Sequence, residues 1–370
     1  MTTTGSITSE ERISRVKELL TSSLRSSRIG NKICKSRPRN AMLGVVFHAC
    51  ARFEQGLPLS DLEQTIIDSL SKVLSDDELR EHGRSYKAMS PDNRTAMFPD
   101  NIASRSIESS YTKKEFSEDL RTKIVPELLA QPNVRIVDPK EIASGAVPNP
   151  EEDESYLSAM KEYSHGITIY HSPSTDGAER STMSVKITLD RFKCTDESNE
   201  LSDSDEIFWG TAASSDTGGK KTYRSKVFND VDDGITFEFP TDPAPILFEG
   251  TLDQALVCSI ECWEEDQGSG WSEISSAMLD IADKCQEAAE NLSDDDETEL
   301  AAAIAIVAFF VTTILGAIFA SFEDDLIKQR DFAWNQEALN KFKSQAQGEG
   351  PWTFNGGGSE GCHLLYIRYK

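Results

Sequence analysis

The chain has 370 residues, and its 63 Asp and Glu against 38 Lys and Arg give a formal net charge of −25. This acidity excludes a protein whose whole surface binds nucleic acid, which needs clustered Lys and Arg, and it permits cation binding. The length suggests two or three domains, and 17 Phe, 8 Tyr and 5 Trp are enough to build their cores.

The first twelve residues lack the basic and apolar regions of a secretory signal, so we expect synthesis in the cytosol and, for any action outside the cell, a non-classical route. The seven cysteines are an odd number and widely scattered, which is typical of reduced thiols. Cys258 and Cys262 have a C-x-x-x-C spacing, but no second ligand pair stands near them in the sequence. Two cysteines on one face of a strand is the simpler interpretation.

A basic arm begins the chain. Residues 1–40 hold nine basic and three acidic residues, a net charge of +6, which leaves −31 for the remainder. Such an arm can bind an anionic membrane, a nucleic acid or a carrier protein, and the alternative is a solvated helix face. The basic residues are Arg12, Arg15, Lys17, Arg25, Arg28, Lys32, Lys35, Arg37 and Arg39.

Residues 1–130 are expected to form a helical domain. Apolar residues recur at three- and four-residue spacing between Ile13 and Leu24, as one face of an α-helix requires. A further helix is expected over 113–130, interrupted or kinked near Pro126. Two capping boxes predict helix starts, at Ser60-x-x-Glu63 and Ser75-x-x-Glu78.

Residues 131–163 are interpreted as a connector that holds four prolines, followed by a short helix over 153–163. The hydrophobic period then changes from about 3.6 to 2. In 182–190 apolar and polar residues alternate, which predicts a strand with one buried face. The other strand candidates are 167–170, 207–213, 222–228, 235–239, 256–263 and 363–369. We therefore expect an α+β protein with an antiparallel β-sandwich over 164–370.

The expected sandwich is interrupted by a helical insertion over 271–323. Residues 272–292 have the pattern of an amphipathic helix, and an acidic run over 294–299 leads into 23 residues without charge, Leu300 to Phe322. As a helix this stretch is about 35 Å long, enough to cross a bilayer core of about 30 Å. We expect membrane insertion through Leu300, Ile304, Val307, Phe309, Phe310, Ile314, Leu315, Ile318, Phe319 and Phe322. The alternative is a helix that is permanently buried in the protein.

The order of elements over 181–370 resembles the C-two domain, a calcium- and phospholipid-binding β-sandwich. The strand MSVKITLDRFKC precedes an acidic loop over 195–204, residues 255–266 are similar to the family's strand that ends in a calcium loop, and HLLYIRYK is similar to its last strand. Asp324-Asp325-Leu326-Ile327 looks like the family's Asp-Asp-x-Ile-Gly motif. The chain departs from the family where Glu264-x-Asp266 replaces Asp-x-Asp and where 58 positions separate Asp266 from Asp324.

The resemblance implies a Ca²⁺ site at one end of the sandwich, and it places the insertion in the loop that family members present to a membrane. Calcium takes six to eight oxygen ligands, which carboxylates on several loops can supply. The alternative is a solvated acidic rim that keeps the protein soluble. The implied ligands are Asp196, Asp203, Asp205, Glu264, Asp266, Asp324 and Asp325.

No motif indicates an enzyme. His48 and Cys50 lie in an apolar helix pattern and are interpreted as core residues, and the glycines at 356–358 lack the lysine of a phosphate-binding loop. We therefore expect a non-enzymatic, pore-forming or toxin-like effector. Its acidic loops respond to calcium or low pH, its apolar helix enters lipid, and it can form homo-oligomers on the membrane. The alternative is a soluble module that binds an unidentified protein partner.

Overall fold

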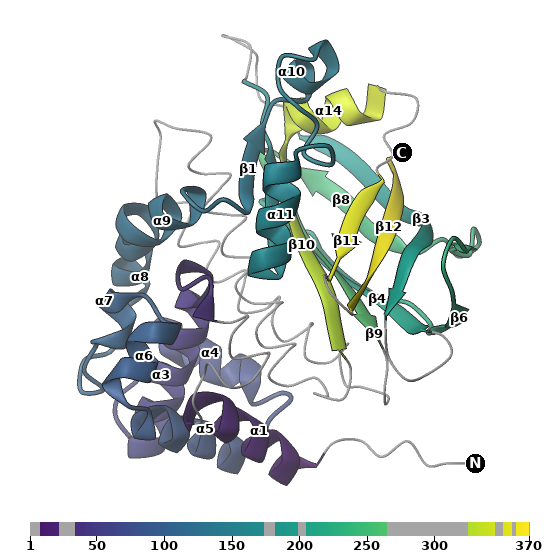
Figure 1. Cartoon of the computed structure of the whole chain (residues 1–370). Helices are drawn as coiled ribbons and strands as arrows, with labels where there is room; N and C mark the ends of the chain where they lie inside the picture. Colours follow the sequence, from purple (N-terminus) through teal and green to yellow (C-terminus); the bar gives the residue numbers. More distant parts are fainter. Residues whose placement is uncertain are drawn as a thin grey trace. The chain divides into compact units, whose positions relative to one another are not determined.

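The computed structural model describes residues 8–21, 34–173, 182–198, 205–264, 325–344, 351–356 and 360–369. The expected helix over 272–292 and the uncharged stretch with all ten of its candidate residues lie outside the described residues. The protein is α+β: the described residues up to Ala130 belong to one unit built of helices, and those from Gln131 onward belong to a second unit that contains two sheets (Figure 1).

The first unit consists of short helices whose starts follow local sequence signals. The predicted capping boxes at Ser60 and Ser75 are confirmed, and Thr112 begins a third. Just before Pro126, a π-helical turn interrupts the α-helical stretch that the sequence predicts over 113–130. The elements are α1 (Ser9–Thr21), η1 (Pro38–Asn40), α3 (Ala41–Gln55), α4 (Asp61–Leu70), α5 (Asp76–Ala88), α6 (Pro91–Met97), α7 (Asp100–Ala103), α8 (Lys113–Asp119), η2 (Leu120–Ile124) and α9 (Val125–Leu129).

Helix α3 forms the centre of the first unit. Its residues from Ala41 to Arg52 are all buried, which includes His48 and Cys50, as the sequence predicts for core residues. Helix α5 crosses α3 at Gly83, where a Cβ atom would overlap the backbone carbonyl of Cys50. Only a glycine allows the two helices to approach this closely.

The capping glutamate of α4 is also the centre of a buried ionic cluster. Glu63 accepts hydrogen bonds from the backbone of Ser60 (2.9 Å) and Tyr111 (2.8 Å), and Arg52 Nε lies 3.1 Å from its Oε2. His48 Nδ1 lies 3.3 Å from Oε1. Burial alone would raise the pKa of Glu63, but these donors outweigh it and lower the pKa. The cluster fixes the segments before α4 and α8 onto α3.

The second unit contains two sheets. Sheet A has the order β1-β2-β10-β9-β4-β5, with β6 beside β4; sheet B has the order β11-β12-β3-β7, with β8 beside β3. The elements are β1 (Val134–Val137), α10 (Pro139–Ser144), α11 (Glu154–Tyr163), β2 (His165–Tyr170), β3 (Met183–Ser198), β4 (Asp205–Ser215), β5 (Lys220–Arg224), β6 (Phe228–Val231), β7 (Thr236–Glu238), β8 (Ile246–Leu252), β9 (Ala255–Glu264), β10 (Asp325–Asn335), α14 (Gln336–Ser344), β11 (Trp352–Asn355) and β12 (Glu360–Tyr369).

Sheet A is mixed, which corrects the expectation of purely antiparallel strands. Strand β1 pairs with β2, and β2 with β10, in parallel. Two parallel neighbours cannot be joined by a tight hairpin, and here α10 and α11 connect β1 to β2. Residues 131–163, which the sequence analysis assigns to a connector and a short helix, thus contribute an edge strand and two helices to the second unit. Pro139 is tolerated because it occupies the first turn of α10.

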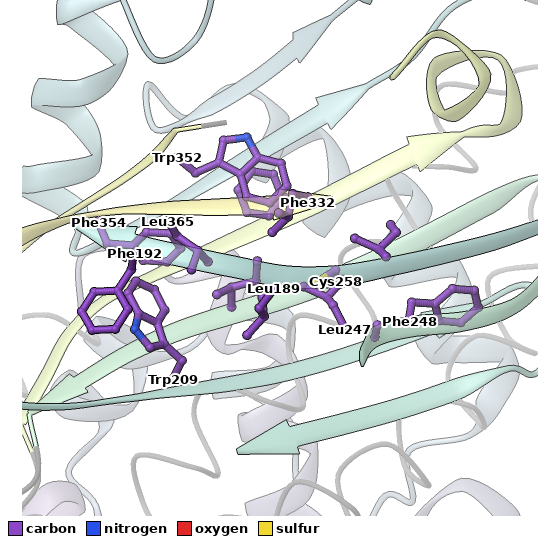
Figure 2. Packing of buried hydrophobic residues seen from close by; sticks show 14 of the residues in the cluster. Leu189, Phe192, Trp209, Leu247, Phe248, Cys258, Phe332, Trp352, Phe354 and Leu365 are labelled. Carbon is purple, nitrogen blue, oxygen red and sulfur yellow. The ribbon is translucent and has the colours of Figure 1, made fainter. Parts of the chain in front are cut away.

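A continuous hydrophobic core fills the space between the sheets. Figure 2 shows Phe192, Leu189 and Leu365 of sheet B facing Trp209, Cys258 and Phe332 of sheet A. The rings of Phe192 and Trp209 lie 5.5 Å apart, and those of Phe332 and Trp352 lie 4.1 Å apart. Aromatic pairs therefore contribute much of the contact between the sheets.

A fully buried guanidinium ties several elements of this unit together. Arg330 of β10 contacts Glu151 (Nη1 to Oε1, 2.5 Å) and Thr168 of β2 (Nη2 to Oγ1, 3.2 Å). The second oxygen of Glu151 accepts the backbone N–H of Thr353 in β11 at 2.8 Å. A buried charge is tolerated here because it is paired and hydrogen-bonded.

Candidate functional site at the acidic end of the second unit

The ends of two strands and the starts of two others lie together in the second unit. Glu264, the last residue of β9, pairs with Ile207 of β4 on one side and with Asp325, the first residue of β10, on the other. Asp205 begins β4, and Ser198 ends β3. The sheet pairing therefore brings together positions that are about 60 residues apart in the sequence.

Two buried carboxylates share one hydroxyl at this end. Asp205 is 2% and Glu264 is 6% exposed. Ser198 donates to Asp205 through its backbone N–H (2.8 Å) and its hydroxyl (2.6 Å), and the same hydroxyl lies 3.3 Å from Glu264 Oε1. The sheet pairing thus holds two acidic side chains around one serine.

More carboxylates surround this pair. The backbone N–H of Glu197 donates to Asp233 at 2.7 Å, and desolvation together with Asp233 and Asp232 raises the pKa of Glu197. Burial, with the charges of Asp205 and Asp233 adding to it, raises the pKa of the Cys194 thiol to about 12. We call the group Asp196, Glu197, Asp205, Asp232, Asp233 and Glu264 the acidic end.

The ion pairs of the described residues leave out most of the acidic end. Asp196, Glu197, Asp205, Asp232 and Asp233 form no ion pair with a Lys or Arg of the described residues. The described residues also contain no group of three or more His, Cys, Asp or Glu arranged to hold a metal ion.

The sequence-predicted ligands divide into three groups. Asp205 and Glu264 lie together, and Asp325 lies opposite Glu264 in the sheet. Asp196 is exposed near the end of β3, opposite Cys362. The remaining predicted ligands, Asp203, Asp266 and Asp324, lie outside the described residues, each within two positions of a residue at this end.

The predicted basic arm is partly used inside the first unit. Helix α1 buries Val16, Leu19 and Leu20. Arg12 pairs with Glu78 at 2.6 Å, and Arg37 pairs with Asp100. One face of the amphipathic helix α1 therefore packs into the hydrophobic core of the first unit. Of the other basic residues, Arg15, Lys17, Lys35 and Arg39 lie within the described segments, and Arg25, Arg28 and Lys32 lie outside them.

One polar cluster is not predicted by the sequence. It lies where the parallel strands β1, β2 and β10 end, at Asp138, His171, Ser172 and Asn335. Asn335 Oδ1 accepts the N–H of Ser172 (3.2 Å) and of Ala338 (3.0 Å), which fixes the amide so that its Nδ2 faces His171 Nδ1 at 3.2 Å. In this arrangement the neutral ring carries its proton on Nε2.

The cluster joins three strand ends. Ser172 donates to Asp138 at 2.5 Å, and Asp138 also caps α10 through the N–H of Lys140. A signal for it exists in the sequence, because each member stands at or just after the end of a short apolar strand run. Its polar groups bond mainly to one another, so we interpret it as a structural tie between strands.

Within the described residues, no helix is both long and apolar enough to cross a membrane. No family model, curated protein or solved structure matches the chain.

Proposed function

We propose that the second unit is a C-two-like β-sandwich behind an N-terminal helical domain, and that the protein acts on lipid membranes. In this proposal the uncharged stretch from Leu300 to Phe322 enters the bilayer when the acidic end binds calcium or is protonated. The activity is pore-forming or toxin-like and needs no catalytic residue.

One observation supports the proposal above the others. Glu264 and Asp325 are direct partners in sheet A, so the 60 residues between them leave and rejoin the sheet at a single point. We call residues 265–324 the β9–β10 connection. A two-residue turn could join the paired Glu264 and Asp325, so the connection is much longer than this strand pairing requires. It also starts and finishes at the acidic end, so a change of charge there acts directly on both of its ends.

The acidic end suits a trigger. A carboxylate that moves toward hydrocarbon must be neutralised or left outside, and acidic residues border the uncharged stretch on both sides. Binding of a cation or of protons at Asp205 and Glu264 would lower the repulsion near the membrane surface.

Liposome co-sedimentation tests the proposal with anionic vesicles at pH 7 and pH 5, each with calcium and with chelator. We expect binding in at least one of the conditions with calcium or at pH 5, and little at pH 7 with chelator. The matched control replaces residues 265–324 by Asn-Gly, which suits a two-residue hairpin turn between the paired Glu264 and Asp325. Binding by this control, or no binding by the full chain in any condition, would refute the proposal and favour a soluble interaction module.

The substitution Asp205→Asn separates the two triggers. With a proton trigger it imitates the protonated carboxyl, and binding at pH 7 without calcium should rise. With a calcium trigger it removes a ligand, and more calcium should be needed for half-maximal binding. The matched control is Glu238→Gln, which removes an exposed charge on β7 and should change neither quantity.

A further inference from the structure

Three cysteines of the second unit lie on three different strands close to the acidic end. Cys194 is near the end of β3, Cys262 is near the end of β9, and Cys362 is near the start of β12. Cys194 and Cys262 are fully buried in the core between the sheets, and Cys362 is half-buried. All three are free thiols.

Strand pairing and ring packing place Cys194 of sheet B over Cys262 of sheet A. Cys262 is the direct partner of Trp209 in sheet A. The ring of Trp209 packs against that of Phe192 in sheet B, with centroids 5.5 Å apart (Figure 2). Cys194 follows Phe192 by two residues on the same inner face of β3.

A second contact fixes the position of Cys194 from its other side. Ser198 is four residues further along β3, and its hydroxyl lies 3.3 Å from the carboxylate of Glu264. Glu264 is two residues beyond Cys262 on β9. Strand β3 therefore touches sheet A before and after Cys194, and both contacts are at or next to the level of Cys262.

Cys362 adds a third thiol at the same place. It is paired with Asp196, and the next residue, His363, is directly opposite Cys194, with a bulge between the two pairs. Burial raises the pKa of Cys262, and the charges of Cys194 and Cys362 add to the rise. Because Cys362 alone of the three is half-buried, a reagent in solution reaches the cluster through its thiol.

We propose that Cys194 and Cys262 form a disulfide that joins the two sheets when the protein meets a low-molecular-weight disulfide such as oxidised glutathione. In immunoglobulin-type sandwiches two facing cysteines join the sheets in this way, with a tryptophan packed beside the bond. Trp209 occupies that place here, as the direct neighbour of Cys262. The inference goes beyond the proposed function, because the bond needs neither lipid nor the β9–β10 connection.

The bond forms by three thiol–disulfide exchanges. The Cys362 thiolate attacks one sulfur of oxidised glutathione and releases one glutathione thiolate. The Cys194 thiolate then attacks the Cys362 sulfur and releases the second. Finally the Cys262 thiolate attacks the Cys194 sulfur, which forms the Cys194–Cys262 bond and restores the Cys362 thiolate. In total, two protein thiols lose two protons and two electrons, and one glutathione disulfide becomes two glutathione thiols.

The cross-link stabilises the acidic end. It joins the two strands that end in Ser198 and Glu264, the residues that meet there. It also connects positions that are 68 residues apart in the sequence, which restricts the unfolded chain and so favours the folded unit. A chain made with reduced thiols thus becomes more stable in oxidising surroundings.

Peptide mapping under non-reducing conditions tests the inference. The folded chain is incubated with oxidised glutathione at about pH 8.5, its remaining thiols are alkylated, and the digest is analysed by mass spectrometry. We expect peptides joined through Cys194 and Cys262. The midpoint of urea unfolding, followed by tryptophan fluorescence, should be about 1–2 M higher than that of the reduced protein.

Matched variants separate this pair from the other thiols. Cys194→Ala and Cys262→Ala should abolish the rise in the midpoint, whereas Cys258→Ala, on the same inner face of β9, should keep it. Cys362→Ala should form the same bond at least tenfold more slowly, and an unchanged rate would overturn the route through Cys362.

The map of the wild-type chain decides the inference even if a variant does not fold. No cross-link in the folded chain, a different pairing, or a cross-link that forms only in urea would overturn it. These readouts use no lipid, so absence of membrane binding together with a mapped Cys194–Cys262 bond would refute only the proposed function.

Discussion

A histidine buried without a polar partner should make the second unit sensitive to acid. The His363 side chain is fully buried, edge-on to the ring of Phe192 at 6.2 Å, and neither of its ring nitrogens has a hydrogen-bond partner within the described residues. Burial lowers its pKa from 6.5 to about 4. The unfolded chain therefore binds the proton more tightly than the folded chain does.

The sign and size of the effect follow from this difference in pKa. The folded state is favoured fully above pH 6.5, and stability falls as the pH drops from 6.5 toward 4. At pH 5 the pKa difference costs the folded state about 2 kcal/mol, which lowers the midpoint of urea unfolding by about 1 M.

Substitution of His363 by Leu should remove this dependence. Urea unfolding at pH 7 and pH 5, followed by tryptophan fluorescence, measures it, because the four described tryptophans all belong to the second unit. From pH 7 to pH 5, the free energy of unfolding of wild type should fall by about 2 kcal/mol relative to that of His363→Leu. His82→Leu is the control: burial also lowers the pKa of His82 to about 4, but His82 lies in α5 of the first unit. If the difference in free energy of unfolding between wild type and His363→Leu is the same at pH 7 and pH 5, the reasoning is refuted.

Three other outcomes concern stability of the first unit and are measured by urea unfolding followed by far-ultraviolet circular dichroism. Glu63→Gln leaves Arg52 buried without its carboxylate and should lower the free energy of unfolding by about 3–5 kcal/mol. A loss below about 1 kcal/mol would contradict the claim that Glu63 holds the buried ionic cluster together. Glu115→Gln removes the same kind of capping glutamate at a site that is 47% exposed, and should cost about 1 kcal/mol or less. Gly83→Ala should cost about 1–3 kcal/mol because its Cβ meets backbone that cannot move aside, and a neutral result would contradict the close approach to Cys50.

Local signals predicted local structure well. The capping boxes at Ser60 and Ser75 act within four residues, so the sequence alone contains both partners. Strands β3 and β9 were found because apolar residues alternate in the one and run continuously in the other. These elements depend little on distant parts of the chain.

Strand β10 shows why other elements could not be predicted. Its middle reads Lys328-Gln329-Arg330-Asp331, which resembles an exposed loop, yet all four side chains are buried. They are tolerated because distant residues satisfy them: Lys328 donates to the carbonyl of Met160 at 2.6 Å, and Arg330 pairs with Glu151. The sequence of the strand alone does not predict these partners, which lie more than 160 residues away in the chain.

The candidate site divides in the same way. The sequence indicated acidic loops, and sheet pairing places Asp205 and Glu264 beside one hydroxyl. Asp196 is exposed and Asp205 is buried. This difference depends on how the ends of β3 and β4 lie in the two sheets, which the composition of the loop does not predict. The tie between His171 and Asn335 joins residues of two distant strands, and only the parallel pairing of β2 with β10 brings them together.

The central claim, that the β9–β10 connection carries the membrane activity, is tested most directly by dye release from anionic liposomes. The full chain and the variant with residues 265–324 replaced by Asn-Gly are compared at equal concentration, at pH 7 and pH 5, with calcium and with chelator. We predict release by the full chain with calcium or at pH 5, and none by the shortened chain in any condition. Equal release by the two proteins, or none by the full chain, would contradict the account.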